Sequence, residues 1–154
     1  MSSYTKDLVW QYDADGYGVT LAPFEFWCDI YGERYTVTIP TMTRFNGASI
    51  PRTVQKLFNW EPYDPRWIKA ATIHDALVNE HGYQGVLVNS DGVGSVPSWQ
   101  LAATVFDEAL RVKQETDNCP DLNRRAFVAA VRFWGCIAHA RTKNHDLGPR
   151  RKGR

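Results

Sequence analysis

The sequence is poor in cysteine, and its few cysteines are widely spaced. The 154 residues include three, Cys28, Cys119 and Cys136, an odd number with no Cys-x-x-Cys pair. A disulfide framework and a zinc ribbon both need cysteines paired at short spacing, so this pattern excludes both classes of small protein. We therefore expect a protein of a reducing compartment.

Long hydrophobic runs are also missing. No window approaches the ~18 uninterrupted apolar residues that a transmembrane helix needs. The N-terminal segment 1–16 has no basic start followed by an apolar stretch, which is the pattern of a signal peptide. We expect neither a membrane span nor a cleaved leader.

The chain also lacks a large net charge. The chain carries 18 Lys and Arg against 17 Asp and Glu, a net charge of +1. This balance excludes the strong global field of a highly basic nucleic-acid binder. The positive charge is nevertheless uneven, because Arg150, Arg151, Lys152 and Arg154 lie within the last five residues. Two interpretations of this basic tail stay open: a solvated terminus, or a contact for an acidic partner or nucleic acid.

What the chain does contain is typical of one folded domain. Apolar residues make up 44% and aromatic residues 13%, enough to build a core at this length. We expect a single α+β domain over residues 1–142, followed by a basic, flexible tail over 143–154. The first third is rich in strand patterns, above all the alternation of Tyr35, Val37 and Ile39 with threonines. Further strands are predicted at 7–12, 17–21 and 24–30, which together form an N-terminal antiparallel β meander.

The remainder of the chain predicts about three α-helices packed on this meander. Asp64 followed by Pro65 is an N-cap and first-turn signal for a helix over 64–81. Ser98 caps a second helix that ends near residue 116, and Pro120-Asp121 opens a third. The glycine-rich segment 84–96 predicts an exposed loop that could hold a short hairpin through residues 86–88.

His74 and Asp75 are the sharpest candidates for chemistry. Adjacent His and Asp can both bind one divalent metal ion, or act as a base and the group that orients it. His81 lies two helical turns further on, roughly 10.5 Å along a straight helix, which is too far to join them directly at one ion. The structural alternative is a hydrogen-bonded histidine at the edge of the core. Both interpretations stay open at this point.

Other candidates come from a turn and from the second helix. Ser49 lies in a Gly-Ala-Ser-Ile-Pro turn that does not match the Gly-x-Ser-x-Gly nucleophile elbow, and it is either a turn serine or a ligand for a substrate. Arg52 either pairs with an acid or holds an anionic group. Helical periodicity directs Asp107 away from the apolar face and places Glu108 at its edge, so Glu108 is the better candidate carboxylate.

Three segments in order resemble a family of small uncharacterised proteins common in tailed phages and prophages. They are the turn Phe45-Asn46-Gly47-Ala48-Ser49-Ile50-Pro51-Arg52, the His74-Asp75-Ala76-Leu77 helix, and the Phe106–Leu110 helix with the later Ala130–Gly135 helix. The resemblance covers about residues 35–138 and implies a phage context, with a location in the virion or the host cytoplasm. Asn46 and Ala103 depart from the family pattern, which has an aspartate at each of these two positions.

Two function classes follow from these residues. The first is a virion-associated or accessory structural protein, in which the polar residues form a network and other phage proteins are the partners. This class needs no cofactor, and the two missing carboxylates favour it. The alternative is a phage hydrolase of cell-wall peptide or a phosphoester, with a divalent metal such as zinc at His74 and Asp75. In that alternative Asn46 and Ser49 hydrogen-bond the substrate, and Arg52 holds its anionic group.

Overall fold

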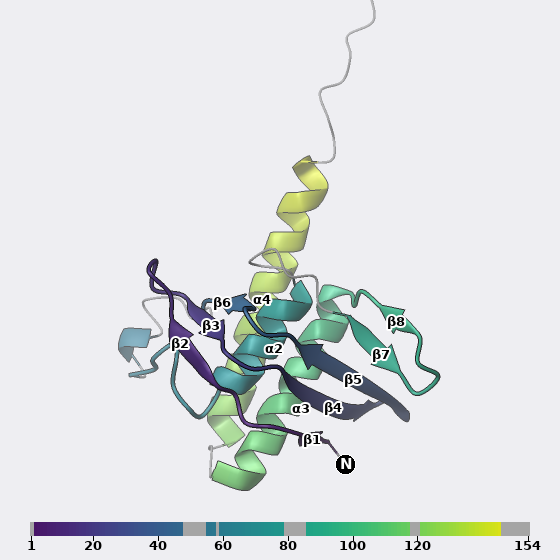
Figure 1. Cartoon of the computed structure of the whole chain (residues 1–154). Helices are drawn as coiled ribbons and strands as arrows, with labels where there is room; N and C mark the ends of the chain where they lie inside the picture. The colour runs from purple at the N-terminus through teal and green to yellow at the C-terminus, as the bar shows by residue number, and fades with distance from the viewer. Residues whose placement is uncertain (1, 48–54, 58, 79–85, 118–120, 146–154) are drawn as a thin grey trace, which may run out of the picture.

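The computed structural model describes residues 2–47, 55–57, 59–78, 86–117 and 121–145, with the side chains of 113–117 and 134–145 outside the description. Strands and helices are both present, with strands mostly in the first half, so the predicted α+β class is confirmed. Figure 1 shows the two sheets and the helices that lie against them. Residues 55–57 form a helical turn.

The larger sheet has five antiparallel strands built around one hairpin. Its spatial order is β1 (Ser3–Tyr4), β4 (Phe24–Ile30), β5 (Glu33–Ile39), β7 (Leu87–Asn89) and β8 (Gly94–Ser95). The turn between β4 and β5 has positive φ at Tyr31 (54°) and Gly32 (81°), as a two-residue hairpin turn requires. The described part of the segment 84–96 forms a hairpin of β7 and β8, which extends the sheet beyond β5. Leu87 of this hairpin is fully buried, so the prediction of an exposed loop was wrong, because pairing with β5 brings the segment into the sheet.

The smaller sheet has three strands, in the order β2 (Trp10–Tyr12), β3 (Gly18–Thr20) and β6 (Arg44–Phe45). The N-terminal strands are thus antiparallel throughout but shared between two sheets. The physical reason is the length of the strands. Strands of two or three residues form few hydrogen bonds with a neighbour. The short strand β1 therefore pairs with the long strand β4, and β6, which comes later in the chain, pairs with β3.

Three helices follow, and two of them begin near the predicted caps. The helix α2 (Ile68–Val78) is preceded by a turn in which the Asp64 carbonyl accepts N–H groups from Trp67 and Ile68, at 3.1 and 3.0 Å. Ser98 Oγ accepts the N–H of Leu101 at 3.2 Å and caps α3 (Trp99–Asp117). The last helix, α4 (Asp121–His145), continues three residues past the point where the tail was expected to begin.

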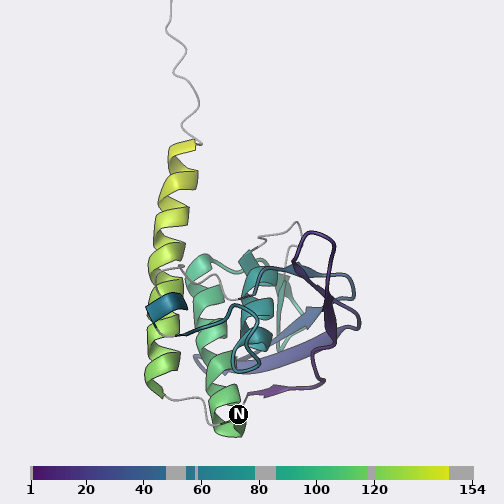
Figure 2. The same cartoon turned by 90° about the vertical axis from the view of Figure 1, so that its left-hand side faces the viewer.

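The elements stack in layers, as the rotated view shows (Figure 2). Helices α2 and α3 lie against the larger sheet, and α4 packs on the outer side of α3. Alternate residues of β4 from Phe24 to Ile30 face this core, and they are all buried. Helix α2 is buried on almost every side because the sheet, β6 and α3 surround it. Among the described residues, none of the helices combines the length and apolar character needed to cross a bilayer.

Candidate functional site

His74 and Asp75 lie in the middle of the buried helix α2. The side chain of Asp75 is 2% exposed and that of His74 is 18% exposed, and the gap between His74 Nδ1 and Asp75 Oδ1 is 4.0 Å. Neighbouring residues on a helix point about 100° apart, which explains why they are close without a short hydrogen bond. Asp75 therefore faces the interior, and His74 lies at the edge of the core, the position that the structural alternative expects.

The buried carboxylate of Asp75 fastens the predicted turn to the helix. The backbone N–H of Asn46 donates to Asp75 Oδ2 at 3.0 Å, across 29 residues of sequence. Asn46 comes directly after β6, so this bond joins the end of the smaller sheet to the centre of α2. Removing such a buried acceptor would leave an N–H group without a partner, which is one of the larger losses a single hydrogen bond can produce.

Gly47 makes the close approach of this turn possible. Its φ is +76°, and a Cβ added there would lie 2.5 Å from the carbonyl oxygen of Pro62. Only glycine fits both the left-handed backbone and this contact with the neighbouring loop. The turn is therefore held on one side by Asp75 and on the other by the backbone at Pro62.

His74 packs against the helix α3. Its ring lies 5.4 Å from the ring of Phe106, measured between centroids and tilted by 60°. Ala103, one turn earlier on the same helix, is 1% exposed. Positions 46 and 103, where the resemblance led us to expect aspartates, thus lie beside Asp75 and one turn from the Phe106 contact. The alanine side chain at 103 packs in the core but, unlike an aspartate, has no oxygen that could bind a metal ion.

Several predicted site residues lie outside the described part of the chain. Ser49 and Arg52 fall within residues 48–54, so their distances to His74 and Asp75 stay untested. The expectation that the turn and the helix meet is supported by the Asn46 hydrogen bond at the first residues of the turn. His81 and the tail residues from Asp146 onward are likewise outside the description.

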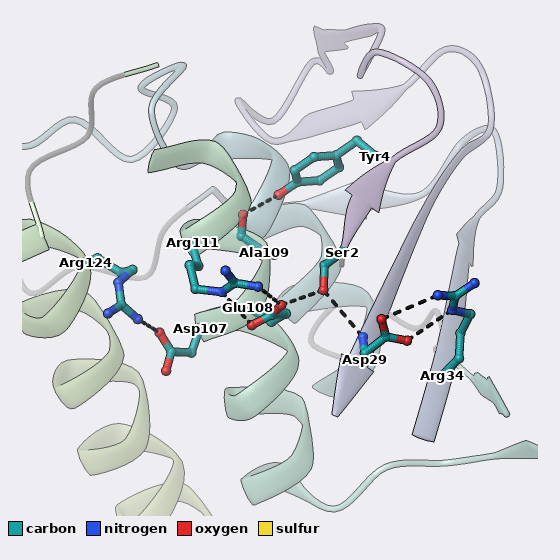
Figure 3. Close-up of polar contacts among 9 residues, drawn as sticks. All are labelled: Ser2, Tyr4, Asp29, Arg34, Asp107, Glu108, Ala109, Arg111 and Arg124. Atoms are coloured by element: carbon teal, nitrogen blue, oxygen red, sulfur yellow. Dashed lines mark hydrogen bonds and ion pairs between the residues drawn. The ribbon is translucent and has the colours of Figure 1, made fainter. Parts of the chain in front are cut away.

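Glu108 was a candidate binding residue, and the structure places it in a separate polar cluster at the N-terminus (Figure 3). Its carboxylate accepts the Ser2 hydroxyl at 2.5 Å and the Arg111 guanidinium at 2.5 and 3.0 Å. The Arg111 hydrogen bonds hold the pKa of Glu108 below its usual range. Tyr4, on the neighbouring strand β1, donates its hydroxyl to the Ala109 carbonyl at 3.0 Å. This cluster fastens the N-terminal strand to α3.

The aromatic cluster next to Asp75 was not predicted from the sequence. Tyr63 stacks on Trp10 with centroids 5.3 Å apart, and the rings of Tyr12 and Phe45 contact both of them. Burial raises the pKa of Tyr63, and the negative charge of Asp75 adds to the shift. The signal was present in the strand 10–12, where Trp10 and Tyr12 lie two residues apart and so share one face of the sheet.

The donor set around His74 bears on the metal that the hydrolase alternative requires. The described residues contain no group of three or more His, Cys, Asp or Glu side chains placed to hold one metal ion. At His74 and Asp75 two such side chains are present, and Asp75 Oδ2 already accepts a backbone N–H. A zinc site built from described residues alone therefore falls short of the three protein ligands usual for this ion.

Comparison with known proteins identifies the family of the chain but not an activity. No curated protein and no solved structure matches it. A family model matches residues 23–131, which is 109 of the 154 residues and includes β4, β5, α2 and α3. The chain belongs to the family described as "Protein of unknown function (DUF1353)".

Proposed function

We propose that this chain is a phage-encoded virion-associated or accessory structural protein, and that His74, Asp75 and the 46–52 turn form a network that holds its fold. The observation that supports this most is the environment of Asp75. Its side chain is 2% exposed, and one oxygen accepts the Asn46 N–H from a distant part of the chain. A carboxylate in this position is engaged in joining two segments.

A catalytic role for Asp75 would require a different environment of its carboxylate. A general base or a metal ligand must lie within about 3 Å of the proton or ion on which it acts, with a path for the substrate. A carboxylate buried without bonding partners would destabilise the fold, whereas one that accepts backbone N–H groups stabilises it. Gly47, packed on the Pro62 carbonyl, restricts the same turn from the other side. A turn that is bonded to Asp75 on one side and packed on Pro62 on the other is what we expect in a protein with a structural role.

The partners in this proposal are other phage proteins, in the virion or in the host cytoplasm. The basic tail residues Arg150, Arg151, Lys152 and Arg154 give the chain a second kind of contact, with an acidic partner or with nucleic acid. Large exposed side chains such as Tyr31 and Met42, 92% and 71% exposed, are available at loop tips for assembly contacts.

A metal-dependent hydrolase is the second candidate. The specific observation in its favour is that His74 is partly exposed and lies beside Asp75, where the turn that carries Ser49 begins. In this candidate His74 and Asp75 hold a divalent ion such as zinc, and the substrate is a cell-wall peptide or a phosphoester. The ion would polarise the scissile group and activate water.

Complementation by Asp75→Asn separates the two candidates. The amide keeps the shape and an acceptor oxygen for the Asn46 N–H but loses the negative charge that a metal ligand or a base needs. We would delete the gene from the phage that carries it and measure particle yield with wild type, Asp75→Asn or no copy supplied in trans. The structural proposal predicts that folded Asp75→Asn restores yield and that the protein sediments with purified particles. A folded Asp75→Asn protein that fails to restore yield, together with wild-type cleavage of cell-wall fragments, would favour the hydrolase.

A further inference from the structure

The charge of this chain divides sharply at the start of its last helix. Residues 122–154 contain nine Lys and Arg and a single acid, Asp146, which gives a net charge of +8. Residues 1–121 contain nine Lys and Arg against 16 Asp and Glu, a net charge of −7. The balanced total of +1 thus conceals an acidic body and a basic C-terminal segment. Such asymmetry is typical of a protein that contacts a polyanion through one part only.

The helix α4 carries the described part of this basic segment. It packs on α3 over its first half, and its C-terminal half projects past the rest of the described structure in both views (Figures 1 and 2). No acid occurs in α4 after Asp121. Because the acidic body repels a polyanion, a basic helix that extends beyond that body is the part of the chain better suited to contact one.

A groove of about 240 Å³ lies where α4 packs on α3. It is lined by Asp107, Arg124, Arg125, Val128, Ala129 and Arg132. Small side chains at 128 and 129 leave room between the arginines. Helical spacing explains the arrangement of the charges, because Arg125 and Arg132 are seven residues apart, two turns and roughly 10.5 Å along one face.

The arginines of this groove differ in how far they are already neutralised. Arg124 is fixed in place, since it pairs with Asp107 of α3 and with Asp121 at 3.0 Å (Figure 3 shows the Asp107 pair). Arg125 also pairs with Asp121, at 2.6 Å, but its side chain is 73% exposed. Arg132 is exposed, and none of the described residues forms an ion pair with it. Three arginines against two aspartates leave the groove with positive charge directed at solvent.

We propose that the groove between α3 and α4 binds the phosphate backbone of a nucleic acid, with Arg125 and Arg132 as the contacting residues and Arg124 as the residue that positions them. This site is independent of His74 and Asp75 and goes beyond the structural role proposed above. Guanidinium groups match phosphate oxygens in bidentate pairs, which favours phosphate as the ligand chemistry. Duplex DNA offers one negative charge per ~1.7 Å of axis, a density suited to a linear basic segment. The proposed contacts are to phosphates and not to base edges, so binding does not depend on the base sequence of the nucleic acid.

The test is a salt titration of binding by the full chain. We would measure fluorescence anisotropy of a labelled DNA duplex of about 20 base pairs, a length that exceeds the span of the helix, over a series of salt concentrations. The variant is Arg125→Gln/Arg132→Gln, whose exposed side chains can be replaced without opening the core. The matched control is Lys6→Gln/Lys56→Gln, which removes the same charge from two exposed positions on the acidic body. Circular dichroism of each variant confirms that it is folded.

We expect the wild type to bind at low salt, with an affinity that falls as salt rises. The arginine variant loses about tenfold or more in affinity, and its salt slope falls by about two, one for each phosphate contact removed. The control binds like the wild type. The proposal is overturned if the wild type does not bind, or if the arginine variant keeps the wild-type affinity and slope. It is also overturned if polyglutamate displaces the duplex as well as unlabelled DNA does, since the groove would then suit an acidic protein.

Discussion

Replacing Asp75 with alanine should weaken the fold far more than replacing an exposed aspartate. The carboxylate is 2% exposed and accepts the Asn46 N–H at 3.0 Å. Alanine would remove the acceptor of this part-buried N–H, which costs about 1–3 kcal/mol. The atoms removed also leave a void in a helix surrounded by core, which adds to the loss. We expect the free energy of unfolding to fall by about 2–4 kcal/mol in total.

Urea denaturation followed by the fluorescence of the six tryptophans would measure this loss. With a slope of about 2 kcal/mol per molar urea, usual for a protein of this size, the midpoint should move down by about 1–2 M. The matched control is Asp91→Ala, because Asp91 is exposed in the turn between β7 and β8. The control should change the free energy by less than about 0.5 kcal/mol. If Asp75→Ala proves as mild as Asp91→Ala, the carboxylate does not hold the turn and our reasoning is wrong.

Three more predictions come from single described residues. Gly47→Ala should destabilise by about 2 kcal/mol or more in thermal or urea unfolding, and Gly92→Ala by only about 1 kcal/mol. Both glycines have a φ of +76°, but only Gly47 packs on a neighbouring carbonyl, so equal losses would contradict the account. Burial raises the pKa of the Cys28 thiol to about 12, so iodoacetamide at pH 8 should leave its peptide unlabelled until the protein is denatured. Hydrogen bonds from Arg34 hold the pKa of Asp29 at about 2, below that of the unfolded chain, so the pair stabilises the fold above pH 4 and loses its effect as the pH falls towards 2. Arg34→Gln should therefore lower stability at pH 6 and matter little near pH 2, and an equal effect at both values would refute this assignment.

The sequence predicted the elements with strong local signals and missed those that depend on tertiary pairing. The strand 24–30 is dense in aromatic residues, which favour strands, and its predicted bounds match β4. Ser98 marked the start of α3 because an N-cap is a local hydrogen bond. The strand β1 has two residues, too few for a period, and exists because β4 offers a free edge. Its pairing could not be predicted from its own residues.

The candidate site was predicted in the same partial way. Both predicted function classes brought the turn and the His74-Asp75 helix together, and the Asn46 bond to Asp75 is consistent with this. Asp107 was directed towards solvent by helical periodicity, but it pairs with Arg124 because α4 lies over that face of α3. Periodicity within one helix cannot show which other helix will cover its polar side. The charge division at residue 122 was available from the sequence, but its meaning depends on where α4 lies.

The central claim is that the polar residues around His74 hold the fold, and the free energy of unfolding of His74→Ala in metal-free buffer tests it most directly. His74 lies at the edge of the core, with its ring 5.4 Å from that of Phe106 and its side chain 18% exposed. Removing the ring takes away this packing and leaves a void at the edge of the core. We predict a loss of about 2 kcal/mol, with no metal ion present before or after the change. A neutral or stabilising effect, together with loss of a bound metal or of a hydrolytic activity that the wild type possesses, would contradict the claim.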